Sequence, residues 1–173
     1  MSKNSGLSWA LLISLSVIWG SSFVLMHEGL KVFSSSQLAA YRLSIAGLIF
    51  LPFALINLKK IERKDIKWFV LAGLLGNFIP AFCFAHAQTY ILSSTAGALN
   101  SLTPFFTLLA GVLLFSKSFN KYKIIGMLFG LSGALILVLN KPGGGIESHL
   151  EYGGLIILAT LLYGINAVSY THL

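Results

Sequence analysis

Residues 95–115, TAGALNSLTPFFTLLAGVLLF, decide the fold class, because they carry no charged side chain and are long enough to cross a membrane. A helix rises about 1.5 Å per residue, so about 20 apolar residues span the hydrocarbon core of a bilayer. The same criterion predicts six membrane spans along the chain: Leu7–Met26, Gln37–Asn57, Trp68–Tyr90, Thr95–Phe115, Tyr122–Asn140 and Tyr152–Tyr170. The expected fold is therefore all-α, a polytopic membrane bundle of six transmembrane helices.

The composition excludes a water-soluble domain. Of the 173 residues, 56% are hydrophobic and 10% are charged, whereas a water-facing surface needs far more polar residues. The net charge of +7 does not indicate a nucleic-acid partner, because the basic residues lie in short loops between apolar runs. The single cysteine, Cys83, excludes an intramolecular disulfide and argues against a cysteine-based metal site.

The basic residues predict how the chain lies in the membrane. With a cytoplasmic N-terminus, nine of them fall in cytoplasmic segments and two, Lys31 and Lys141, fall outside, while Arg42 lies within the second span. Short cytoplasmic loops carry such an excess of Lys and Arg, so we expect the N-terminus to be cytoplasmic. The first span could also be a cleavable signal peptide, but its length and the bulky aromatic residues around positions 20–22 favour a retained helix.

The glycine-rich segment 141–151 divides the chain into a longer and a shorter part. Across it, residues 9–13 (WALLI) align with 153–157 (GGLII), and residues 19–22 (WGSS) align with 163–166 (YGIN), both at an offset of 144 residues. Short matches of this kind also arise between apolar helices by composition alone. However, a unit of five spans must begin its second copy from the opposite side of the membrane, as the inverted repeats of many transporters do. The predicted parts are a five-helix repeat at 1–140, an external linker at 141–151, and the first helix of a truncated second repeat at 152–173.

Several motifs are similar to those of a known family. They are Trp19-Gly20-Ser21-Ser22-Phe23, Tyr41-Arg42-Leu43, Ala85-His86-Ala87-Gln88-Thr89-Tyr90 running into Ser94-Thr95-Ala96-Gly97, Leu102-Thr103-Pro104-Phe105-Phe106-Thr107-Leu108-Leu109-Ala110, and the spaced glycines from Gly126 to Gly133. Together they resemble the EamA-like family of the drug/metabolite transporter superfamily over essentially the whole chain.

The resemblance implies ten helices in two five-helix repeats that move small metabolites, often exporting amino acids or drug-like compounds across the bacterial inner membrane. It implies a small-molecule substrate and the lipid bilayer as partners. On this basis we expect the 173-residue chain not to transport alone, unless a homodimer completes the bundle. The family usually places a Glu just after the fourth span, where this chain has Lys117. The charge is reversed at this position, so a function of that Glu is not transferred to this chain.

No catalytic, metal or cofactor site is expected. The acidic residues all lie in or beside predicted loops, so no span offers the paired carboxylates of a hydrolase. The four histidines lie in unrelated segments and not at the spacing of metal ligands. The sequence therefore does not favour an enzyme.

Polar residues inside the spans are the candidate substrate-binding residues: Trp19, Ser22, Arg42, Asn77, His86, Gln88, Asn100, Thr103, Tyr163 and Asn166. In the fourth span, Asn100 and Thr103 share one helical face with small residues. Such a face is either a packing seam or the lining of a cavity. Pro104 deprives the Asn100 carbonyl of its helical donor, as in the broken helices of transporters, which favours the cavity.

The hypothesis of a polar cavity extends to the third span. It also extends to the first and sixth spans, which carry aligned motifs. Asn77 and Gln88 lie on one stripe of the third span, which Pro80 interrupts. Trp19 and Ser22 occupy the same repeat positions as Tyr163 and Asn166, and matched helices of an inverted repeat face each other across the substrate path. Trp19 could stack on a substrate or belong to the interfacial aromatic belt.

Two ionisable residues within spans each have two interpretations. Arg42 lies close enough to the outer end of its span to snorkel, as an anchor or as a partner of Glu28 or of a helix-end carbonyl. Alternatively, it attracts carboxylate-bearing substrates. His86 either hydrogen-bonds in the membrane interface or carries a coupling proton.

Two function classes remain. Polar residues aligned on several spans favour a carrier that alternates access around a cavity. The competing function is that of a non-transporting membrane scaffold or assembly subunit, to which the close-packing glycines Gly126, Gly130 and Gly133 would also be suited.

Overall fold

The computed structural model describes residues 5–115, 121–139 and 150–169. Its helical elements are α1 (Ser5–Gly29), α2 (Ser35–Asn57), the 3₁₀ turn η1 (Leu58–Lys60), α3 (Ile66–Gly73), the π-helical turn η2 (Leu74–Phe78), α4 (Ile79–Ala87), α5 (Ser93–Asn100), α6 (Thr103–Phe115), α7 (Lys121–Leu139) and α8 (Leu150–Ser169). The described part contains no strand, and the predicted fold class is confirmed.

The predicted spans coincide with these helices to within three residues at each end. Five helical stretches are long and apolar enough to cross a membrane: Gly6–Gly29, Ser35–Asn57, Ile66–Ala87, Ser93–Leu113 and Glu151–Ser169. The fifth predicted span corresponds to α7, which contains the shorter apolar stretch Ile124–Gly133. Lys117 and most of the predicted linker 141–151 lie outside the described residues.

Local signals in the sequence account for where these helices begin and turn. Ser34 caps α2 through a capping box, in which its hydroxyl accepts from the Gln37 amide at 3.3 Å and its own amide donates to Gln37 Oε1 at 3.0 Å. The helix before it ends at Gly29, whose carbonyl accepts from the Phe33 amide at 2.9 Å. These bonds satisfy backbone groups that a helix end leaves without partners.

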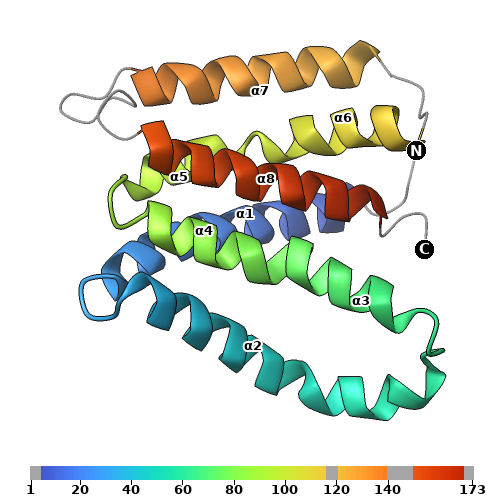
Figure 1. The fold of residues 1–173 in the computed structure, drawn as a ribbon. Helices are drawn as coiled ribbons and strands as arrows, with labels where there is room; N and C mark the ends of the chain where they lie inside the picture. The colour runs from blue at the N-terminus through green and yellow to red at the C-terminus, as the bar shows by residue number, and fades with distance from the viewer. Residues whose placement is uncertain (1–4, 116–120, 140–149, 170–173) are drawn as a thin grey trace.

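Helix α8 lies at the centre of the bundle. It packs against α4 and η2 on one side and against α5 and α6 on the other, as Figure 1 shows. Helix α2 packs against α4, α1 against α5, and α7 against α5. The buried cluster joins α1, α2, α4, α5 and α8 and is rich in alanine: Met26, Ala39, Phe84, Ala85, Ala87, Ala96, Ile156 and Ala159. Small side chains allow membrane helices to approach closely, which is their main means of packing in lipid.

Candidate functional site

The third span is interrupted by a π-helical turn. Leu74–Phe78 forms η2, in which the Ile79 amide donates to the Leu74 carbonyl five residues earlier. Ile79 is followed by Pro80, which has no N–H to offer the Gly76 carbonyl, so the regular helical hydrogen bond to that carbonyl cannot form. The interruption was expected at Pro80, and the structure places it in the turn before the proline.

The fourth span is broken between α5 and α6. The amides of Ser101 and Leu102 donate to carbonyls three residues earlier, at 3.1 Å each, so the chain makes a tight turn here. Pro104 removes the donor that the Asn100 carbonyl would have in a helix. The Thr103 hydroxyl lies 3.4 Å from Asn100 Oδ1, and both residues are half-buried. The predicted break at Pro104 is therefore confirmed.

Both interruptions lie against α8. A Cβ added at Gly164 would come within 2.7 Å of the Phe106 carbonyl carbon and the Thr107 nitrogen, so α8 touches the backbone of α6 just after the break. A Cβ at Gly76 would overlap the side-chain nitrogen of Asn166, so this amide lies directly on the π-helical turn. Two glycines thus allow α8 to approach both irregular segments.

Tyr163 connects α8 to an aromatic row in the core. Its ring stacks on that of Phe84 in α4 with centroids 6.1 Å apart. The Phe84 ring in turn contacts that of Phe23 in α1, with centroids 5.8 Å apart. Trp19, at the position of α1 that aligns with Tyr163, is 62% exposed. The Ser22 hydroxyl donates to the Trp19 carbonyl at 2.7 Å, and Asn77 is exposed. The structure therefore brings Tyr163 and Asn166 onto the interrupted helices and leaves Trp19 on the surface of the bundle.

Arg42 does not pair with Glu28. Both Glu28 carboxylate oxygens accept from Lys31 Nζ, at 2.7 and 2.8 Å. The Arg42 guanidinium instead donates to the Met26 sulfur at 3.5 Å, and Met26 belongs to the buried cluster. This finding removes the Glu28 pairing that the sequence left open for Arg42.

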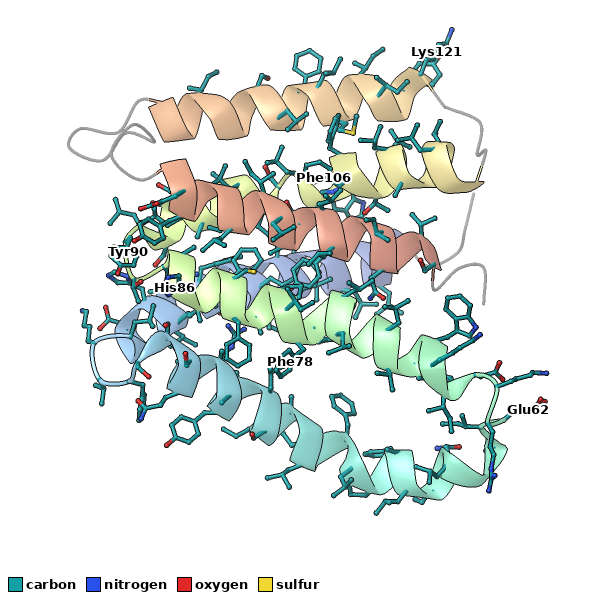
Figure 2. All side chains as sticks on the ribbon, in the orientation of Figure 1. Glu62, Phe78, His86, Tyr90, Phe106 and Lys121 are labelled. Atoms are coloured by element: carbon teal, nitrogen blue, oxygen red, sulfur yellow. The ribbon has the colours of Figure 1, made fainter. Side chains whose placement is uncertain are left out.

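His86 belongs to a cluster at the hairpin end of α4. Its ring packs edge-on against the rings of Tyr90 and Tyr152, with centroid distances of 5.9 and 5.8 Å. The two tyrosine rings stack on each other with their centroids 3.9 Å apart. The Ser35 hydroxyl lies 3.5 Å from His86 Nδ1. Figure 2 shows His86 and Tyr90 together at this end of the bundle. Sequence reasoning missed both tyrosines, because only the folding of α8 onto α4 brings them together.

Gln88 is the most deeply buried of the candidate residues. It is 1% exposed, and neither its side-chain nitrogen nor its oxygen has a hydrogen-bond partner among the described residues. An unpartnered buried amide is costly. The ring nitrogen Nδ1 of His27, which was not among the candidates, is in the same situation.

The chain is similar to known transporters. It matches the EamA-like transporter family over residues 4–139, which confirms the resemblance expected from the sequence. A WAT1-related protein of Arabidopsis thaliana is 33% identical over 65% of this chain and 34% of its own length. A chloroplastic WAT1-related protein of the same plant is 30% identical over 76% of this chain and 32% of its own length. The uncharacterized transporter YetK of Bacillus subtilis is 25% identical over 92% of this chain and 49% of its own length.

These relatives are longer than the chain, which spans about a third to a half of the curated relatives it matches. No solved structure matches it significantly. The family match covers most of the sequence, and the apolar helices agree with a protein that crosses the membrane several times. The chain therefore belongs to the EamA-like transporter family.

Proposed function

We propose that this chain forms part of the substrate path of a carrier for small metabolites, which alternates access around a site where the third and fourth spans are interrupted. The observation that carries this proposal is that η2 and the α5–α6 break both lie against α8. Transporters typically bind their cargo at discontinuous helices, because irregular backbone offers polar groups inside the membrane.

The polar groups at these interruptions fit such a site. Pro104 has no N–H to donate to the Asn100 carbonyl. The Thr103 hydroxyl lies 3.4 Å from the side-chain oxygen of Asn100. Asn166 comes from α8 on the side of the π-helical turn. Amide and hydroxyl groups are costly to place in hydrocarbon, so these side chains favour a water-accessible site over contact with lipid.

The organisation of the carrier is also proposed. Residues 1–140 would form one five-helix repeat, 141–151 an external linker, and 152–173 the first helix of a second, inverted repeat. The nine-to-two distribution of basic residues supports a cytoplasmic N-terminus, with the bacterial inner membrane as the location. A reporter fused within the loop 61–65 should then score as cytoplasmic, and an external signal there would overturn the orientation.

The substrates proposed for the site are amino acids or drug-like compounds, moved outward. No step of this function needs an enzyme's reactive cluster or a cofactor. The alternative is a membrane scaffold whose aligned polar residues only pack helices together. The two functions differ in whether water and substrate reach the fourth span.

Cysteine labelling tests this difference directly. Cysteine is placed at Asn100 or Thr103 in a Cys83→Ala background, and the chain is treated in membranes with a small, charged thiol reagent. We expect both positions to react, and candidate amino acids or drugs to slow the reaction. Leu113→Cys is the matched control, because Leu113 lies on α6, is 71% exposed on the bundle surface and would face lipid.

The control should stay inert, since a charged reagent does not reach a thiol in hydrocarbon. Inertness at both Asn100 and Thr103 would contradict the water-accessible site and favour the scaffold. Reaction at both positions without protection by any tested compound would retain the aqueous site but exclude those compounds as its substrates.

A further inference from the structure

Arg42 is a charged residue within a membrane-spanning helix. It is the eighth residue of α2, counted from Ser35, which places it about 10 Å along the helix axis. An ionised side chain at this depth is costly in lipid, so such residues face water or the bundle interior and pair with another group. The partner of Arg42 therefore decides what it does.

The described residues do not supply a charged partner for Arg42. The two ion pairs among them join Lys31 to Glu28 and Lys64 to Glu62. The hydrogen bond that Arg42 makes goes to the Met26 thioether, which is a weak acceptor. A guanidinium has five N–H donors in a planar fork, so most of its donors have no hydrogen-bond partner among residues 5–115, 121–139 and 150–169.

The side chain of Arg42 is directed toward the inside of the bundle. Met26 is 4% exposed and lies in the buried cluster, so the Arg42 atom beside it sits at the edge of the core. Arg42 itself is exposed. It thus combines an exposed position on the bundle with contact to Met26, a core residue of α1.

We propose that Arg42 binds an oxyanion, the carboxylate or phosphate group of the transported molecule. The proposal rests on the carrier function above and adds the chemical class of its substrate. A guanidinium binds carboxylate and phosphate through two parallel hydrogen bonds, and it keeps its charge throughout the physiological pH range. An anion at Arg42 would supply the acceptors that the described part of the protein lacks.

The chain contains two arginines, Arg42 and Arg63, and this allows a test without mutation. The protein is placed in discs of neutral phosphatidylcholine and treated with phenylglyoxal, which modifies guanidinium groups, and the modified residues are mapped by mass spectrometry. Arg63 lies in the loop between α2 and α3, is exposed, and serves as the internal control.

Three probes separate charge from shape. N-acetylleucine carries a carboxylate, N-acetylleucinamide has the same shape without the charge, and inorganic phosphate carries the charge without the side chain. We expect N-acetylleucine, phosphate or both to slow modification of Arg42 roughly tenfold at saturation, and to leave Arg63 unchanged. The proposal fails if the amide protects Arg42 as well as the acid, if neither anion protects it, or if Arg42 does not react at all.

An anionic lipid headgroup is the other source of an oxyanion. The labelling is therefore repeated in discs of phosphatidylglycerol without added probe. If Arg42 reacts there as in phosphatidylcholine, the anion comes from solution, as proposed. Protection by phosphatidylglycerol alone would keep the oxyanion site but overturn its assignment to the substrate.

Variants give an independent measurement. Arg42→Gln should weaken binding of the protecting anion roughly tenfold or more, because a charged hydrogen bond is lost, whereas Arg42→Lys should weaken it less. Arg63→Gln should leave affinity unchanged. Cysteine labelling at Asn100 and Thr103 does not depend on Arg42. A failure of the anion proposal with reactive cysteines would leave the carrier function standing, and inert cysteines would remove the carrier function itself.

Discussion

Helices α1 and α8 carry aligned sequence motifs but have different surroundings. Residues 19–22 of α1 align with residues 163–166 of α8. Yet Trp19 lies on the surface of the bundle, whereas Tyr163 stacks on Phe84 in the core. The motif therefore does not determine how deeply its residues are buried. Burial depends on which neighbouring helices reach the motif, and α8 has α4 and α6 on either side.

In the proposed inverted repeat, the two helices would be equivalent. The exposed face of α1 would then correspond to the face of α8 that α4 and α6 cover. Alanine substitutions at aligned positions measure this difference, because one copy of the motif is packed and the other is not.

The largest difference is expected between Tyr163 and Trp19. Replacing Tyr163 by alanine removes a half-buried ring from its stack on Phe84 and should lower the free energy of unfolding by roughly 2–4 kcal/mol. Trp19→Ala should change it by less than about 0.5 kcal/mol, since exposed side chains contribute little. Unfolding by SDS in mixed micelles measures both. Equal losses would mean that α1 is packed as tightly as α8.

A smaller difference is expected between the aligned glycines Gly164 and Gly20. Gly164→Ala would force a methyl group against the backbone of α6, which cannot move aside as a side chain can, and should cost roughly 1–3 kcal/mol. Gly20 has open space around it, so Gly20→Ala should be neutral within about 0.5 kcal/mol. The same unfolding assay applies. A neutral Gly164→Ala would show that α8 does not touch α6 at the break.

The smallest effect is expected where α8 meets the π-helical turn. Gly76→Ala places a methyl group against the end of the Asn166 side chain, which can rotate away, so the cost should be about 1 kcal/mol. The cost should vanish in an Asn166→Ala background, which a double-mutant cycle detects. Gly73→Ala, with nothing within 4 Å, is the control. A cost that persists without Asn166 would assign the effect of Gly76 to the turn itself.

The sequence predicted most of the fold because its signals are local. Apolar length defined the spans, and Pro104 defined the break after Asn100, since both depend on neighbours in the chain. The π-helical turn was placed only approximately, because Pro80 signals an interruption but not how the preceding residues accommodate it.

Contacts between distant segments could not be predicted in the same way. The stacking of Tyr90 on Tyr152 and the contact of Asn166 with Gly76 depend on how α8 docks against α4 and η2. The pairing of Glu28 with Lys31 is local but was not predicted, because the sequence equally allows Arg42 as the partner of Glu28. The identity of the buried neighbours thus requires the tertiary arrangement, whereas the polar candidates themselves were visible in the sequence.

The proposed function requires that water reaches the bundle where the fourth span breaks against α8. Hydrogen–deuterium exchange of the chain in lipid discs tests it most directly. We expect the amides of residues 101–103 to exchange at least roughly tenfold faster than those of residues 108–112 in the same membrane span. The amides around Pro52, a proline within the uninterrupted and exposed helix α2, should stay protected by lipid. Protection of residues 101–103 equal to that of residues 108–112 would contradict a water-accessible site at the break.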